Sequence, residues 1–150
     1  MELTPELKEY MDRSVLCWLA TVSGENEPNV SPKEIFTYYG TDKIIVANIV
    51  SPQTVQNITK NDNVCLSFID ILVQKGFKVR GKAKIIKKSC PDFSEMQSVL
   101  TAMTAGQFPF TSITVIPVVE VKPILAPRYV FYPETTEVEQ IENAKKAYGF

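Results

Sequence analysis

Apolar residues along this chain fall into six short runs separated by turn-forming residues. The run from Val15 to Val22 is almost unbroken, which suits a strand buried on both faces. From Phe77 to Ile86, apolar or small residues alternate with basic ones, the pattern of a half-buried strand with a solvated basic face. The runs predict strands over residues 15–22, 28–39, 43–49, 64–69, 77–86 and 111–121.

Prolines and helical spacings refine this outline. Proline cannot donate to a central ladder, so Pro32 predicts that the second strand is bent, bulged or at an edge, and Pro117 predicts an edge or a bulge in the last. Caps and apolar residues three or four apart predict helices over 5–12, 52–60, 94–105 and 134–147. Strands joined by hairpins, with few helices between them, favour an antiparallel sheet that closes into a small barrel.

Length and composition set the class of protein. The 150 residues, 45% apolar and 22% charged, indicate one globular domain. Sixteen basic against seventeen acidic residues give a net charge of −1, which argues against a nucleic-acid surface. No apolar run reaches the roughly 18 residues that span a bilayer, and the first residues do not resemble a signal peptide. A cytoplasmic location without a membrane partner is therefore expected.

The chain contains no histidine, which excludes Ser-His-Asp and Cys-His nucleophiles, histidine metal sites and histidine-ligated haem. The three cysteines, Cys17, Cys65 and Cys90, form no CxxC pair, and the first two suit a core. No G-x-G-x-x-G or P-loop motif occurs. Any chemistry must therefore use carboxylates, Lys, Tyr, Cys or a bound cofactor.

The most informative segment is the predicted strand-to-helix junction over residues 47–57. Ser51 is placed to cap the helix and Pro52 to occupy its first position, so free N–H groups would face outward. With the hydroxyls of Ser51 and Thr54 and the amide of Gln53, this terminus is a suitable phosphate receptor. Asn57, three residues after Thr54, lies on the same helical face. A Ser-Pro helix start also occurs without any ligand.

Two basic residues could complete such a site. Lys33 directly follows the proline that distorts its strand, and Arg80 precedes Gly81, which would permit close approach of a ligand ring. From the residues alone, Lys33 is better explained as an ordinary solvent-facing side chain, and an alternating surface strand explains Arg80 equally well. The aromatic residues Trp18, Phe36, Tyr38 and Tyr39 are better explained by core or dimer packing than by contact with a ligand.

Over residues 14–121 the sequence resembles the FMN-binding split-barrel family related to pyridoxamine 5′-phosphate oxidase. The order and spacing of short segments carry the resemblance: 16–21 (LCWLAT), 29–33 (NVSPK), the junction from 47 to 57, the strand 64–68, and 80–83 (RGKA). The remainder, 122–150, is similar to a C-terminal extension in a subgroup of flavin-nucleotide-binding proteins. The whole chain then forms one domain.

The resemblance implies a mainly β, six-stranded antiparallel split barrel that forms a homodimer and binds FMN at the subunit interface. By position, FMN would be bound by Lys33, Ala47, Asn48, Ile49, Ser51, Gln53, Thr54, Asn57 and Arg80. Gln53 stands where many relatives carry Lys or Arg, which removes a charge from the phosphate site. Without histidine in the C-terminal segment, oxidation of pyridoxamine phosphate itself is not expected.

Three functions remain open at this stage. The first is a flavin-dependent oxidoreductase or electron carrier that acts on an unknown small molecule. The second is a non-enzymatic flavin-binding or storage protein. The third is a binder of another cofactor, such as F420. For the first, no catalytic side chain and no metal are predicted, because a flavin carries the redox chemistry itself.

Overall fold

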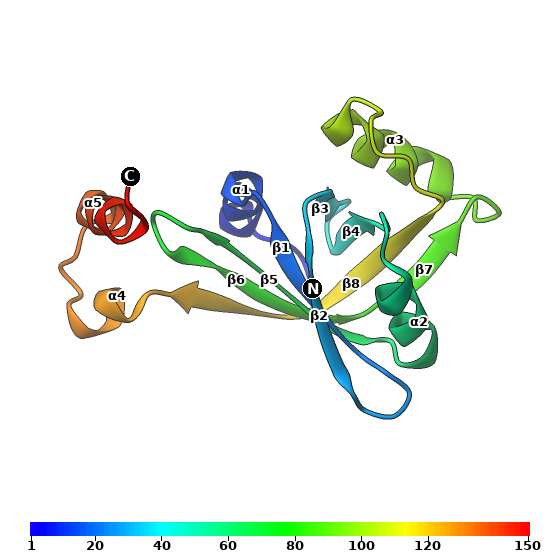
Figure 1. Ribbon diagram of the computed structural model, residues 1–150, viewed down its shortest axis with the longest axis horizontal. Helices are drawn as coiled ribbons and strands as arrows, with labels where there is room; N and C mark the ends of the chain where they lie inside the picture. The colour runs from blue at the N-terminus through cyan, green and yellow to red at the C-terminus, as the bar shows by residue number, and fades with distance from the viewer.

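The structure, a computed structural model of residues 1–150, is built on a curled antiparallel sheet (Figure 1). Its strands are β1 (Cys17–Val22), β2 (Pro28–Lys33), β3 (Phe36–Tyr39), β4 (Lys43–Ala47), β5 (Asn63–Asp70), β6 (Lys75–Lys82), β7 (Lys84–Lys87) and β8 (Ser112–Leu125). They lie in the order β2-β1-β5-β6-β8-β4-β3, and β7 also pairs with β8. The predicted antiparallel, mainly β architecture is confirmed.

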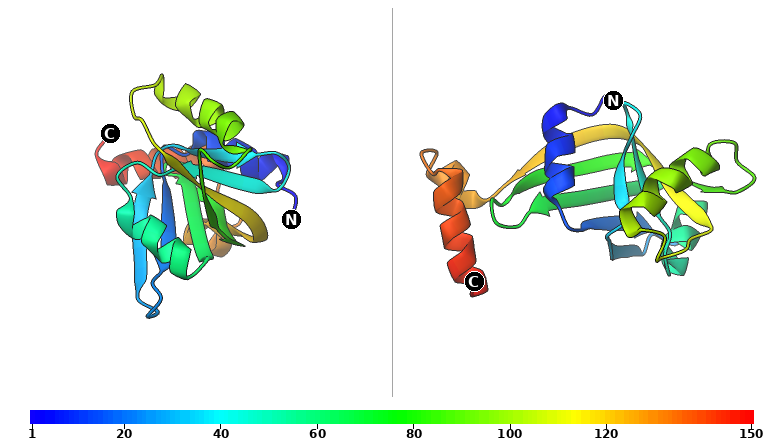
Figure 2. Two further views of the ribbon diagram at one scale, coloured as in Figure 1. Left: turned by 90° about the vertical axis from the view of Figure 1, so that its right-hand side faces the viewer. Right: turned by 90° about the horizontal axis from the view of Figure 1, so that it is seen from above.

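The long strand β8 belongs to both halves of the curled sheet. Its first residues pair with β4 and β7, and its last eight residues, 118–125, lie opposite β6. The sheet therefore bends around β8 into an open half-barrel, as the turned views of Figure 2 show. This shape fits a split barrel.

The prediction of six strands was wrong, because two predicted strands are each divided. After Pro32 the chain bends at Glu34 and Ile35, which separates β2 from β3. Between β6 and β7, the amide of Ala83 donates to the carbonyl of Asp62 at 2.8 Å instead of continuing the ladder. Each predicted run is continuous in the sequence, and the strands are divided where Ile35 and Ala83 form hydrogen bonds with distant residues, Ala47 and Asp62.

Both predictions from proline are consistent with the sheet. β2, which contains Pro32, is an edge strand. Pro117 lies inside β8, and the pairing with β6 shifts register beside it, between Arg80 and Gly81. A Cβ at Gly81 would lie 2.3 Å from the carbonyl oxygen of Pro117, so this crossing requires glycine.

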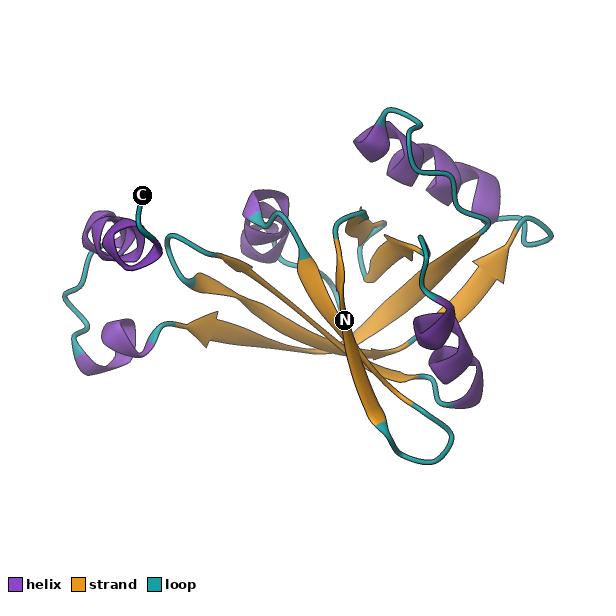
Figure 3. Ribbon diagram, in the orientation of Figure 1, coloured by secondary structure: helices purple, strands orange, loops and turns teal.

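The structure contains five helices around and beyond the sheet, coloured purple in Figure 3. They are α1 (Pro5–Arg13), α2 (Pro52–Lys60), α3 (Phe93–Thr104), α4 (Pro127–Phe131) and α5 (Glu137–Tyr148). Four match predicted helices, whereas α4 lies in a proline-marked segment for which no helix was predicted. The last two extend from the end of β8, on the opposite side of the molecule from α2 and α3. None of the helices has the length and apolarity to cross a membrane.

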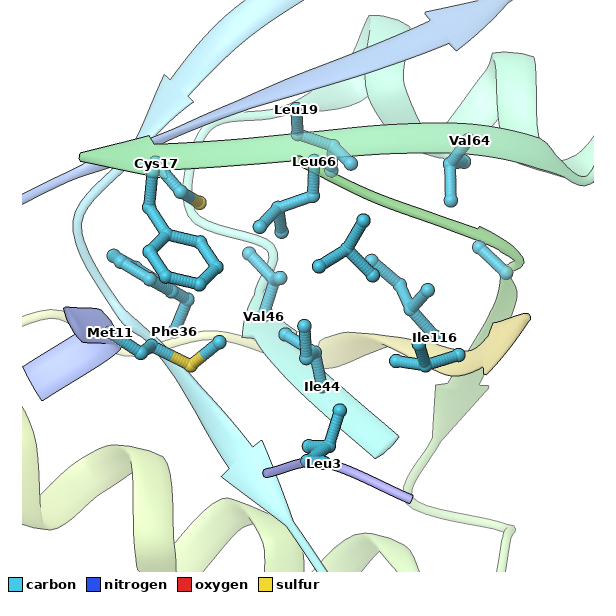
Figure 4. Packing of buried hydrophobic residues seen from close by; sticks show 14 of the residues in the cluster. Leu3, Met11, Cys17, Leu19, Phe36, Ile44, Val46, Val64, Leu66 and Ile116 are labelled. Carbon is cyan, nitrogen blue, oxygen red and sulfur yellow. The ribbon is translucent and has the colours of Figure 1, made fainter. Parts of the chain in front are cut away.

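The two faces of the sheet differ in burial. Leu19, Leu66 and Val79 lie opposite one another on the inner face and are fully buried in the main core (Figure 4). On the outer face, Trp18 is 48% exposed and Cys65 is only half-buried. The prediction that the first strand is buried on both faces was therefore wrong for a single chain. No other part of the chain covers the outer face of β1 at Trp18.

A second, smaller core lies between α3 and the strands β4 and β8. It contains Phe93, Met96 and Leu100 from the helix, with Ala47 and Phe110. This cluster fixes the end of β4 and the segment that leads into β8. Both of these belong to the site described next.

Candidate functional site

The junction between β4 and α2 contains an unusual backbone conformation. Val50 has a φ of 49°, and its side chain is 96% exposed. A β-branched residue is rarely found in this left-handed region, because its side chain crowds the backbone. Such strain is concentrated at functional sites in proteins. The conformation turns the chain sharply between the end of β4 and the start of α2.

Ser51 occupies the N-cap position of α2, but its side chain does not cap the helix. Its hydroxyl donates instead to the carbonyl of Ile49 at 3.0 Å. The N–H groups of Gln53 and Thr54 in the first turn therefore lack the side-chain acceptor that an N-cap usually supplies. The expected capping role of Ser51 is not found, and the helix keeps free donors and a partial positive charge at this end.

Lys33, the last residue of β2, donates a hydrogen bond from its ammonium to the hydroxyl of Ser51. The residue is only 8% exposed. No carboxylate lies within 4.0 Å of its nitrogen. Burial lowers the pKa of the Lys33 side chain below its usual value, because the charged form loses hydration. The predicted alternative of a solvent-facing lysine was wrong.

The thiol of Cys17 does not balance this charge. Cys17 lies opposite Lys33 in the pairing of β1 with β2 and is fully buried. Burial raises the pKa of the thiol to about 12, so the side chain is neutral at physiological pH. The buried ammonium thus lies at a helix N-terminus without an ion-pair partner, and the nearest acidic residue along the chain, Glu34, lines the same cavity but forms no salt bridge with it.

Further along α2, two predicted residues, Thr54 and Asn57, make contacts that hold the helix on the sheet. The hydroxyls of Thr54 and Ser31 lie 3.2 Å apart. Asn57 donates to the hydroxyl of Thr21 at 2.9 Å and accepts from Gln53 at 2.8 Å. Because Thr54 and Asn57 are almost fully buried, these bonds fix the position of the helix start relative to Lys33.

Asn48 connects the end of β4 to the start of β8. Its side-chain amide donates to the hydroxyl of Ser112 at 3.1 Å, and its carbonyl accepts from Thr114 at 2.7 Å. Its backbone N–H donates to the carbonyl of Ser112 at 3.2 Å. In this structure the Asn48 side chain is engaged within the protein and positions the two strands against each other.

Of the predicted site residues, Lys33, Ala47 and Ile49 line a cavity of about 270 Å³. Gln53 and Asn57 line a separate, more open hollow beside α2. Ile35, Ala47 and Ile49 give the cavity at Lys33 an apolar wall. Phe108, from the segment between α3 and β8, also lines it and is 53% exposed. Sequence reasoning missed Phe108, because only the fold brings this segment to the end of β4.

Arg80 is the one predicted site residue that the fold separates from the others. It lies on the outer face, in register with Cys65, whereas Lys33 is in register with Cys17 on the inner face. Its guanidinium forms an exposed ion pair with Glu120. Within one chain, Arg80 does not join the cluster around Lys33.

A larger apolar groove, of about 690 Å³, lies on the outer face near the turn between β5 and β6. Its lining includes Trp18, Ile71 and Ile124, with the C-terminal Phe150. It shares no lining residue with the cavity at Lys33. Hydrophobic surface is thus left open on the face opposite the polar cluster. Of the other aromatic residues considered above, Phe36 is in the main core, as expected.

Comparison with known proteins gives the family. The family model for pyridoxamine 5′-phosphate oxidase matches residues 3–142. The chain belongs to this family. The resemblance seen in the sequence is therefore confirmed over nearly the whole chain. The comparison with curated proteins found no match.

Solved structures share the fold at low sequence identity. HupZ from Group A Streptococcus superposes with a TM-score of 0.68 at 22% identity, over 79% of this chain and 91% of its own. An FMN-binding protein from Syntrophomonas wolfei superposes with a TM-score of 0.64 at 18% identity, over 81% of this chain and 88% of its own. HutZ, the heme storage protein from Vibrio cholerae, superposes with a TM-score of 0.63 at 18% identity, over 81% of this chain and 94% of its own. About a fifth of the present chain lies outside each of these three superpositions.

Proposed function

We propose that this protein binds FMN and acts as a flavin-dependent oxidoreductase or electron carrier on a small molecule. The observation that carries the proposal is the buried ammonium of Lys33, which is bonded to the Ser51 hydroxyl but has no counter-ion, at the uncapped N-terminus of α2. A buried charge without a partner is costly, and an anion placed between this ammonium and the free N–H groups would offset that cost. The family and the FMN-binding structural neighbour support the choice of ligand.

The residues fit the phosphate end of FMN. Lys33 supplies a positive charge, and the amides of Gln53 and Thr54 supply free donors at the helix terminus. In the proposed complex the hydroxyls of Ser51 and Thr54 turn from their partners within the chain toward the phosphate. Charge-assisted hydrogen bonds are roughly twice as strong as neutral ones. Lys33 therefore takes over the role for which relatives use a basic residue at position 53, and Asn57 holds the helix from behind.

The adjoining cavity fits the ring end. Ile35, Ala47 and Ile49 provide an apolar surface for a planar ring in the cavity that Lys33 also lines. When bound, the flavin supplies hydride or electron transfer itself. The chain contributes binding, orientation and a positive potential from Lys33, which favours a reduced, anionic flavin. No catalytic step is assigned to a side chain, and the carboxylate of Glu34, which also lines the cavity, is given no role in the reaction.

We further propose that two copies of the chain complete the site. A cavity of about 270 Å³ is small beside the roughly 300–1,000 Å³ of typical ligand pockets, so one chain encloses only part of FMN. The exposed outer face, with Trp18 and Val30, offers the surface for a second copy. Arg80 would contribute to binding only from that second copy, because it faces away from Lys33 in its own chain.

A haem ligand, suggested by the heme storage neighbour, is less well supported by this chain. Without histidine, the protein offers no imidazole to bind the iron. Neither a second cofactor nor a metal is required by the residues around the cavity.

Titration of the purified protein with FMN tests the proposal. Lys33→Met is expected to weaken binding about 10- to 100-fold, from loss of a charge-assisted bond. Lys88→Met, which removes an exposed lysine elsewhere, serves as the matched control and should change the affinity less than about twofold. Equal affinities for the wild type and Lys33→Met would contradict the phosphate assignment.

The same preparation distinguishes catalysis from storage. Repeated turnover with NAD(P)H and an added electron acceptor would support the oxidoreductase. Slow, stoichiometric reduction of the bound flavin would indicate the carrier or storage role instead. A wild type that does not bind FMN would overturn the proposal as a whole.

A further inference from the structure

We propose that Phe108 is the aromatic wall of the ring-binding part of the site, so that this cavity selects planar, conjugated ligands. The inference rests on the function proposed above and goes beyond it, because it assigns ring recognition to a residue that the sequence motifs do not include. It starts from an exposed aromatic side chain that lines the same cavity as Lys33.

The segment that carries Phe108 is held firmly at its first end. At the end of α3, Ala105 and Gly106 both have positive φ, of 51° and 77°. The N–H of Gly106 donates to the hydroxyl of Thr104 at 3.2 Å, and the N–H of Gln107 donates to the carbonyl of Thr104 at 3.1 Å. These bonds terminate the helix and fix the direction in which the chain leaves it.

The second end is held equally well. Phe110 is buried in the small core under α3. Ser112 is bound to Asn48 through both side chain and backbone, at 3.1 and 3.2 Å. Pro109 restricts the conformation of Phe108 directly before it. The exposed ring of Phe108 is therefore held between two anchored ends and is not the tip of a loose loop.

This arrangement suits a ring more than a flexible apolar chain. Ile35, Ala47 and Ile49 contribute aliphatic side chains to the cavity that Lys33 also lines, and Phe108 adds the one aromatic ring in its lining. An aromatic ring prefers offset-stacked or edge-to-face contact with another ring and adds binding energy beyond area burial. Because the backbone around Phe108 is already fixed, little ordering is needed when a ligand binds.

Competition experiments separate the two ends of the site. Binding of FMN, riboflavin and inorganic phosphate is measured for the wild type, Phe108→Ala, Phe108→Tyr and Lys33→Met. Phe108→Ala should weaken FMN and riboflavin about tenfold and leave phosphate within about twofold, since it removes only a ring contact. Phe108→Tyr should restore binding to near the wild-type value. Lys33→Met should show the opposite selectivity and weaken phosphate but not riboflavin.

Phe131→Ala provides the control, because Phe131 is an exposed phenylalanine on α4, outside the cavity. If Phe108→Ala binds riboflavin and FMN as tightly as the wild type, this inference is overturned and the proposed function still stands. Equal weakening of phosphate by Phe108→Ala would also overturn it, since the residue would then support the fold of the site. A wild type that does not bind FMN overturns both.

Discussion

The inner and outer faces of strands β1 and β2 differ in how completely one chain satisfies them. On the inner face, Leu19 is fully buried and Ser31 meets Thr54 of α2. On the outer face of the same two strands, Trp18 and Val30 remain exposed. The inner face is finished within the chain except for one feature, the unpaired charge of Lys33. The outer face lacks a partner for its apolar surface, whereas the inner face lacks one for a charge.

The largest effect expected from this difference is on stability. Leu19→Ala should lower the free energy of unfolding by about 3 kcal/mol, because it leaves a cavity in the main core. Val30→Thr, of nearly equal shape on the outer face, should change it by less than about 0.5 kcal/mol in the monomer. Urea unfolding at low protein concentration measures both. Similar losses for the two variants would show that the faces do not differ as described.

The next effect concerns association. Val30→Glu should weaken formation of the proposed dimer at least about tenfold, because it places a charge in an apolar interface. Val138→Glu makes the same change at an exposed valine of α5 and should leave association unaltered. Sedimentation over a range of concentrations distinguishes the two. If the wild type sediments as a monomer, or if both variants behave alike, the outer face is not the interface.

The smallest effect tests the inner face. Lys33→Met should raise the free energy of unfolding of the ligand-free protein by about 1 kcal/mol at pH 7, because it removes a buried, unpaired charge. Since burial lowers the pKa of Lys33, the folded protein releases this proton before the unfolded chain does. Wild-type stability therefore rises with pH relative to the variant in the interval below the ordinary lysine pKa of 10.5.

Denaturation of both proteins at pH 7 and pH 10 measures this. The advantage of Lys33→Met should shrink at the higher pH. An advantage that grows with pH, or a destabilised variant at pH 7, would mean that Lys33 stabilises the fold and is not kept for a ligand.

The sequence predicted the elements well because their signals are local. The Pro52 helix start and the alternation in β6 follow from a few neighbouring residues, and both were confirmed. The divisions at Ile35 and Ala83 were missed, because they depend on contacts with distant parts of the chain. The exposure of Trp18 was missed for a related reason, since an apolar run does not reveal whether its second face is covered by the same chain.

For the site, sequence order was informative only where the residues are close in the chain. The junction from Ala47 to Asn57 could be identified as a unit, and the fold brings Lys33 to it. Phe108 could not be found, because more than fifty residues separate it from Ile49. Arg80 was grouped with this site from the sequence, but the fold of one chain separates it, because successive strand residues alternate between faces and its partner in register, Cys65, lies on the outer face. FMN binding by the predicted residues stays a prediction for the titrations above.

The missing side-chain cap on α2 has a consequence for how the protein would behave without its cofactor. An N-terminus with unsatisfied amides frays more readily than a capped one. A phosphate seated there would act as a detachable cap, so loading of the ligand and local folding of α2 would be thermodynamically linked. The first turn of α2 would then be more ordered in the ligand-bound protein than in the ligand-free one.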